Sequence, residues 1–233
     1  MHKLTVDVWS DIACPWCWVG KRRLAAALAD FPHRDAVDVV YRSFELDPSA
    51  ARTLATDTPH TVRIARKYGI DVAQAEAMSQ RLVAVAAGDG LELRFDILRP
   101  GNTLDAHRLL HLARDRHLQD ALAERLFRAY LGEGQPIGEP SVLIALALEV
   151  GLDRGEVEGV LASDAYTPDV RADEEEARQL GIRGVPCFVF GPRHAVSGAQ
   201  PAAALLEALT IAWGELSSDT ILEGTVCTPD GCT

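Results

Sequence analysis

The feature that most constrains the fold of this chain is the tetrapeptide Cys14-Pro15-Trp16-Cys17, because of its position. It follows an alternating apolar run at 4–9 that is typical of a β-strand, and it opens a stretch with helical periodicity. A second alternating run at 37–44 completes a strand–helix–strand unit. The pattern predicts an α/β fold with the cysteine pair at the carboxyl end of the first strand, where open α/β sheets bind their ligands.

The spacing of the two cysteines predicts redox chemistry. Cysteines three positions apart at the start of a helix lie on one face, close enough to form a disulfide. Unpaired N–H groups and the partial positive charge of the helix N-terminus favour the thiolate of Cys14, so we expect Cys14 to attack and Cys17 to displace the captured group. Half of a zinc site is the alternative, but zinc needs a second pair or histidines.

Net charge and composition limit the classes of binding partner and the cellular compartment that we expect for this protein. A formal net charge of −11 argues against nucleic acid or an anionic membrane as the main partner. No segment approaches the ~20 consecutive apolar residues of a membrane span, and residues 1–9 lack the features of a signal peptide. We therefore expect a soluble, cytoplasmic protein, where a Cys-x-x-Cys pair is more often catalytic than structural.

The rest of the sequence predicts a block of helices followed by a second stretch of mixed helices and strands. Helical patterns separated by Gly and Pro occur at 62–68, 72–87, 104–117, 119–131, 141–150 and 154–161. A further helix at 168–180, strands at 187–190 and 195–196, and a last helix at 201–213 follow. We expect a discontinuous α/β domain (1–50 and 168–214), an inserted all-helical domain (51–167) and a C-terminal tail (215–233).

The cysteine tetrapeptide together with Gly184-Val185-Pro186 ahead of a strand resembles the DsbA branch of the thioredoxin superfamily, in which a helical domain interrupts a thioredoxin fold. The resemblance implies a disulfide oxidoreductase that acts on disulfide-bearing or dithiol proteins or on small-molecule disulfides. It implies that the protein binds no metal or organic cofactor. It also implies that glutathione is an exchange partner. It also implies that Pro186 is cis beside the cysteine pair and that the Val185 backbone binds substrate. We expect Trp16 to shape the exposed side of the site.

Within that branch the chain is most similar to FrnE-like cytoplasmic proteins, which carry a second cysteine pair near the C-terminus. Here this pair is Cys227 and Cys232, separated by Thr-Pro-Asp-Gly. A loop with Pro and Gly turns tightly enough to bring its two end sulfurs together. The pair is either a second redox pair that exchanges with the first, a structural clip, or two unpaired thiols.

Several further residues have two interpretations. Many thioredoxin-fold oxidoreductases carry a proton-accepting carboxylate six residues before the nucleophile, where this chain has Val8; Asp11 is the nearest acid and is either a substitute or a loop residue. His107 and His111 have the spacing of metal ligands on a helix, but packing histidines are favoured. Cys187 is expected to be a buried, unreactive cysteine.

Two local features have simple structural interpretations. Thr103, within the segment 102–108 that relatives of this family also carry, is a plausible helix cap. The acidic run 173–176 is expected to lie on the solvated early turns of a helix.

Two other function classes remain open. Hydroxychromene-carboxylate isomerases and kappa-class transferases share the expected architecture and use glutathione, but they generally carry Ser where this chain has Cys14. A redox-linked chaperone or binding protein would use an apolar groove in the helical block.

Overall fold

The centre of the molecule is a four-stranded sheet with the order β2-β1-β3-β4. The computed structural model describes residues 3–53, 58–218, 227–228 and 231–232. The strands are β1 (Leu4–Ser10), β2 (Val37–Ser43), β3 (Cys187–Phe190) and β4 (His194–Ser197). β1 runs parallel to β2 and antiparallel to β3, and β3 runs antiparallel to β4. Strands separated by more than 140 residues of sequence are therefore direct neighbours.

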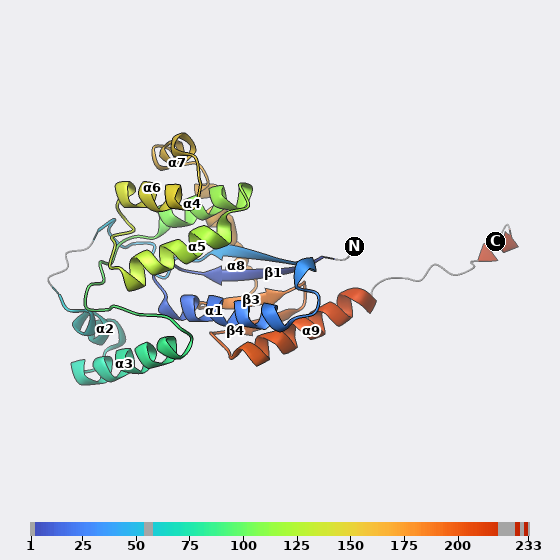
Figure 1. Ribbon diagram of the computed structural model, residues 1–233, viewed down its shortest axis with the longest axis horizontal. Helices are drawn as coiled ribbons and strands as arrows, with labels where there is room; N and C mark the ends of the chain where they lie inside the picture. Colours follow the sequence, from blue (N-terminus) through green and yellow to red (C-terminus); the bar gives the residue numbers. More distant parts are fainter. Residues whose placement is uncertain (1–2, 54–57, 219–226, 229–230, 233) are drawn as a thin grey trace.

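Both faces of the sheet are covered, because successive side chains of a strand point to opposite faces. On one face α1 (Pro15–Asp30) packs along α9 (Ala202–Ser218), as Figure 1 shows. Val8 and Phe188 belong to the main core cluster on this side. On the other face Trp9 and Cys187 pack with Ala177 of α8 (Thr167–Gln179). This is the α/β sheet that the sequence pattern predicts, with the thioredoxin-type arrangement that the resemblance implied.

The helices of the insertion fall into two groups (Figure 1). α2 (His60–Tyr68) and α3 (Val72–Gly88) pack as a pair, and Gly69 in the left-handed region ends α2. The second group contains α4 (Leu104–Asp115), α5 (Gln119–Phe127), the π-helix η2 (Arg128–Gly132), α6 (Pro140–Glu149) and α7 (Arg154–Leu161). A short 3-10 helix, η1 (Arg34–Ala36), precedes β2.

Four details differ from the sequence-based expectations. The helix predicted over 119–131 is α5 followed by η2. The last helix continues to Ser218 and so extends into the predicted tail. Thr103 is the N-cap of α4 by position, but the side chain of Asn102 accepts the Leu104 N–H.

The fourth difference concerns the acidic run on α8, whose first member is not solvated. Asp173 is only 3% exposed. Its carboxylate accepts hydrogen bonds from the Ser43 N–H (2.9 Å) and Arg42 (3.1 Å), and His111 lies 3.1 Å away. These partners lie far along the chain, so a local charge pattern could not reveal them.

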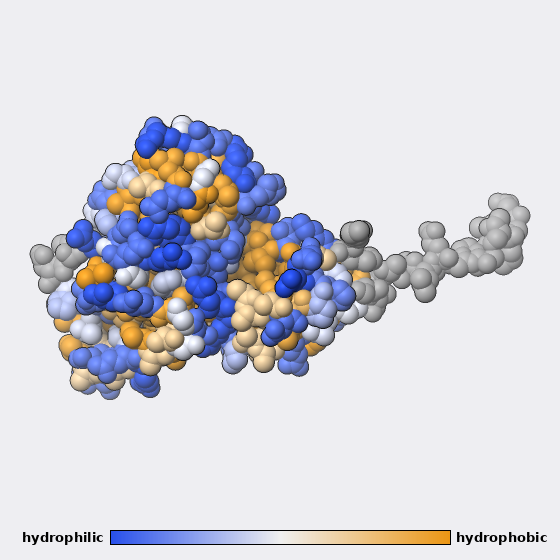
Figure 2. All heavy atoms as spheres, in the orientation of Figure 1, coloured by the Kyte–Doolittle hydropathy of each residue, from blue (hydrophilic) through white to orange (hydrophobic). Residues whose placement is uncertain are grey.

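The face drawn in Figure 2 is mainly hydrophilic, with apolar residues gathered in separate patches. Among the described residues, no helix is long and apolar enough to cross a membrane.

Candidate active site

The cysteine pair lies where β1 ends and α1 begins. Cys14 is the N-cap of α1, Pro15 is its first residue, and the Cys17 N–H donates to the Cys14 carbonyl at 3.0 Å. Cys14 and Cys17 are free thiols, 6% and 2% exposed, whereas Trp16 between them is 40% exposed. The first turn of α1 therefore carries two buried thiols, with the exposed indole of Trp16 between them in sequence.

The two thiols have opposite acid–base properties. The hydrogen bond from the Cys17 thiol, with the first backbone N–H groups of the helix, lowers the pKa of Cys14 below its usual value, despite burial and the charge of Asp11. Burial raises the pKa of Cys17 well above its usual value, although the Ser10 hydroxyl acts in the opposite direction. Cys14 is therefore the sulfur that ionises first, with Cys17 as its proton-bearing partner.

The loop before β3 lies against this pair. The Cys14 thiol donates to the Val185 carbonyl, with an S–O distance of 3.6 Å. The Val185–Pro186 peptide bond is cis, as the resemblance implied. Residues 171 positions apart in sequence are thus in direct contact, because β3 pairs with β1 and delivers its preceding loop to the end of β1.

A largely apolar groove of about 380 Å³ runs from Cys14 and Trp16 to the α2–α3 pair. Its walls include Ile64, Met78, Leu82, Phe95 and Leu98. His60 stacks on Phe95 with ring centroids 4.4 Å apart, and burial lowers its pKa to about 4, so it is uncharged at neutral pH. A second hollow of about 280 Å³ shares part of this wall and extends to Asp11, Arg63 and Tyr130.

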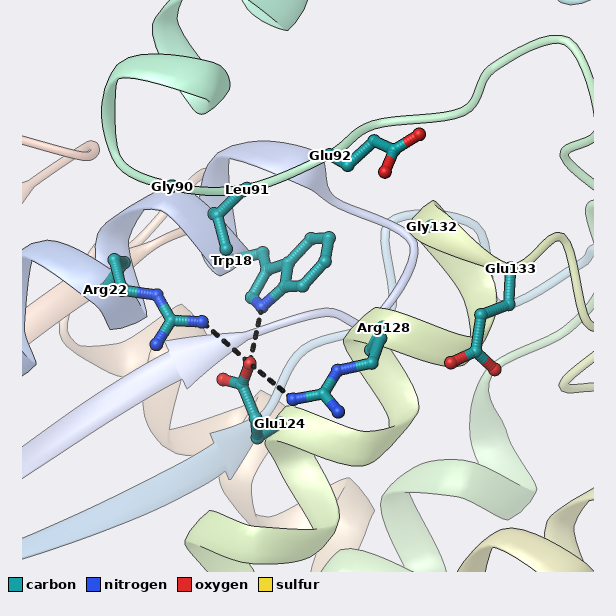
Figure 3. Close-up of a pocket in the computed structure, with 9 residues that line it drawn as sticks. All are labelled: Trp18, Arg22, Gly90, Leu91, Glu92, Glu124, Arg128, Gly132 and Glu133. Atoms are coloured by element: carbon teal, nitrogen blue, oxygen red, sulfur yellow. Dashed lines mark hydrogen bonds and ion pairs between the residues drawn. The ribbon is translucent and has the colours of Figure 1, made fainter.

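Trp18 does not line this groove; it borders a separate hollow and anchors α1 to the insertion. It is 4% exposed, and its indole N–H donates to Glu124 of α5 at 3.3 Å. Figure 3 shows Arg22 and Arg128 reaching the same carboxylate at the edge of a hollow of about 340 Å³. Trp18 therefore packs inward, whereas Trp16 is exposed.

Asp11 holds the loop that carries Cys14. Its Oδ1 accepts from the Ala13 N–H (3.1 Å) and its Oδ2 from the Leu46 N–H (2.8 Å), while its main-chain carbonyl accepts from the Cys14 N–H (3.0 Å). The interpretation of Asp11 as a loop residue is therefore supported. His107 of α4 also lies beside the Asp11 carboxylate, and no sequence pattern indicates this contact because the two residues are 96 positions apart.

The remaining candidates have different surroundings. His107 and His111 contact different carboxylates, those of Asp11 and Asp173, and do not share one site. Cys187 is 5% exposed, as expected, and burial raises the pKa of its thiol. Cys227 and Cys232 lie opposite each other in the antiparallel strands β5 (Cys227–Thr228) and β6 (Gly231–Cys232). Their side chains lie outside the described part of the structure, so their redox role and the FrnE-like likeness stay predictions.

Comparison with known proteins agrees with this architecture. A crystal structure of a probable DsbA oxidoreductase from Streptomyces coelicolor is 47% identical to this chain, with a TM-score of 0.86 over 99% of this chain and 98% of that chain. Two more distant structures share the fold. A 2-hydroxychromene-2-carboxylate isomerase has a TM-score of 0.64 at 18% identity, over 94% of this chain and 100% of that chain.

The second is the cytosolic disulfide reductase DsbM from Pseudomonas aeruginosa, with a TM-score of 0.59 at 19% identity, over 94% of this chain and 100% of that chain. Its structure with GSH has a TM-score of 0.53 at 21% identity, over the same shares of the two chains. A family model described as "DSBA-like thioredoxin domain" matches residues 5–210. Since this match spans most of the chain and the sheet, insertion and cysteine pair agree with it, the chain belongs to the DsbA-like family of thioredoxin-fold thiol oxidoreductases.

Proposed function

We propose that this protein exchanges disulfides with protein or small-molecule substrates through Cys14 and Cys17. The observation that carries the proposal is the opposite acid–base behaviour of the two thiols at the end of a groove. The pKa of Cys14 lies below its usual value and that of Cys17 well above. A nucleophile needs to be ionised near neutral pH, whereas a resolving thiol keeps its proton until it reacts.

The proposed cycle uses only these two thiols and an exchange partner. The Cys14 thiolate attacks a substrate disulfide, which forms a mixed disulfide and releases one substrate sulfur as thiolate. Cys17 then loses its proton and attacks the Cys14 sulfur, which releases the second substrate sulfur. The substrate disulfide is reduced to two thiols, and the Cys14–Cys17 pair is oxidised to a disulfide. The cycle runs in reverse when the substrate is a dithiol.

Surfaces around Cys14 suit an extended peptide. The groove beside Trp16 offers apolar walls, and the Val185 carbonyl lies within hydrogen-bonding distance of the reacting sulfur. Backbone groups at the end of a strand recognise peptides irrespective of sequence. We assign substrate-binding roles to Trp16, Val185 and Pro186 on this basis.

Glutathione is the proposed exchange partner, and a cytoplasmic setting belongs to the same proposal. The fold-level likeness to a disulfide reductase that is described as cytosolic and whose structure with GSH is known supports both. A cytosolic glutathione pool keeps thiols reduced and would regenerate the dithiol form.

Reduction of a disulfide-bonded protein such as insulin tests the proposal. Cys14→Ser should abolish the activity, because it removes the attacking sulfur. Cys17→Ser should leave the first attack intact and accumulate mixed disulfides on Cys14, which mass spectrometry detects. Cys187→Ser is the matched control, because Cys187 lies on the opposite face of the sheet and should leave the activity unchanged. Equal alkylation rates for Cys14 and Cys17 at neutral pH would contradict the assignment.

The same variants separate the two alternatives. The first alternative is a glutathione-dependent isomerase or transferase, since a 2-hydroxychromene-2-carboxylate isomerase has a similar fold. Such an enzyme activates the thiol of bound glutathione and needs no pair of cysteines. Its activity would survive Cys17→Ser. A chaperone or binding protein that uses the apolar groove would suppress aggregation equally well in Cys14→Ser and in the wild type.

A further inference from the structure

A buried histidine meets the loop that carries the cysteine pair. His107 lies on α4 and is 1% exposed. Its Nε2 is 3.4 Å from Oδ1 of Asp11, which is also 1% exposed, and neither ring nitrogen has a hydrogen-bond partner among the described residues. Burying a polar ring without partners costs free energy. Within the part of the chain that the structure describes, the carboxylate within ion-pair distance of the ring is that of Asp11. An ion pair between it and a protonated His107 would offset part of this cost.

The carboxylate in question is fixed beside Cys14. The hydrogen bonds from Ala13 and Leu46 set the orientation of the Asp11 side chain, and the Asp11 carbonyl accepts the N–H of Cys14 itself. A negative charge so close to a thiol opposes formation of the thiolate. The charge of Asp11 accordingly raises the pKa of Cys14, against the stronger effect of Cys17.

No local residue offsets this charge. Residues 10–17 contain Asp11 but no Lys, Arg or His, and the dipeptide between the cysteines is Pro-Trp. A compensating cation has to come from another element. Among the described residues, the ion pair recorded for Asp11 is with His107.

We propose that His107 is a positioning residue that acts through Asp11: when its imidazole carries a second proton, it neutralises the carboxylate that faces Cys14 and so favours the Cys14 thiolate. The inference deepens the proposed function, since it rests on Cys14 as the nucleophile. By reciprocity, formation of the thiolate favours proton uptake by His107. The helical insertion would thus contribute a proton-binding group in addition to the groove walls.

Several titratable and charged groups surround the Asp11–His107 pair. Tyr130 of η2 faces Asp11; burial and the Asp11 charge raise its pKa, while Arg63 of α2 acts in the opposite direction, so Tyr130 stays neutral at physiological pH. Arg63 lines the same hollow as Asp11, and its guanidinium donates to the Thr58 carbonyl. Three further pairs of charged groups lie nearby: Asp105 with Arg108, His111 with Asp173, and Glu45 with Arg171.

The test is an ultraviolet titration of the Cys14 thiolate in the reduced full-length protein, with the variants His107→Gln and Asp11→Asn and the double variant. His107→Gln should raise the pKa of Cys14 by about 0.5 unit or more, which is about a threefold fall in the thiolate-to-thiol ratio. Asp11→Asn should lower it. In the Asp11→Asn background, His107→Gln should have no effect, because the charge that it compensates is gone.

His111→Gln is the matched control, since His111 lies one turn further along α4 and contacts Asp173. It should leave the Cys14 titration unchanged. An unaltered titration in His107→Gln, or an equal shift in both Asp11 backgrounds, would overturn the inference.

A second measurement uses the wild-type chain and does not depend on the folding of any variant. Alkylation of Cys14 with iodoacetamide removes its charge, so the NMR titration of His107 should move to lower pH while that of His111 stays in place. No movement of the His107 titration overturns the inference. Neither measurement requires turnover, so a failure of the proposed oxidoreductase activity would be seen separately.

Discussion

Replacement of Gly20 by Ala tests how tightly α1 packs against the loop before β3. A Cβ atom at this position would lie 2.9 Å from Cζ of Phe188 and 3.0 Å from Cγ of Pro186. Carbon atoms are attracted only beyond about 3.5 Å. Phe188 is 0% exposed and Pro186 is buried, so neither side chain has open space to enter.

The expected cost follows from two opposing terms. Overpacking of a well-filled core costs about 1–3 kcal/mol, and a helical Ala is favoured over Gly by up to about 1 kcal/mol. Because both neighbours are enclosed, we expect the steric term to dominate and Gly20→Ala to destabilise the protein by about 1–2 kcal/mol. For a chain of this size the melting temperature should fall by about 2–8 °C.

Thermal unfolding followed by circular dichroism measures this change, with Gly159→Ala as the matched control. Gly159 also lies inside a helix, α7, but a Cβ there would have no neighbour within 4 Å. Only the propensity gain remains, so Gly159→Ala should stabilise the protein. Insulin reduction should slow in Gly20→Ala alone, because displacement of Pro186 moves the Val185 carbonyl from the Cys14 sulfur. A Gly20→Ala protein as stable as the wild type would refute the steric argument.

Two further perturbations address the buried charges and the tail. Burial raises the pKa of Asp173, but hydrogen bonds from His111 and the Ser43 amide and the charge of Arg42 outweigh it and hold this pKa below its usual value. The resulting stability is present above the unfolded-state pKa of about 3.9 and is lost as the pH falls through the lower folded-state value. Asp173→Asn should therefore cost about 1–3 kcal/mol in urea unfolding at pH 7 and progressively less below about pH 4; a pH-independent difference would contradict this. For the tail, Cys227→Ser with Cys232→Ser should slow steady-state reduction of a bulky disulfide and leave alkylation of Cys14 unchanged; an unchanged steady-state rate would make the pair a clip or a bystander.

The α/β class, the inserted helices and the place of the cysteine pair follow from local sequence. Alternation of period two predicted β1 and β2, and the strand–turn–helix setting of Cys14 placed it at the start of α1. These features depend on residues within one or two turns of each other, so the sequence contains all the information they need. The family resemblance added the cis bond before Pro186, which the spacing of residues alone did not indicate.

Tertiary structure decided which distant groups meet these sulfurs. The contact of Cys14 with Val185 needs the pairing of β1 with β3, and the approach of His107 to Asp11 needs α4 to pack beside the loop between β1 and α1. The burial of Asp173, which its acidic neighbours concealed, arises in the same way from the packing of α8 on β2. Charge patterns report only what lies nearby along the chain. A buried charge is set by partners that the chain brings together from far apart, and these exist only once the protein has folded.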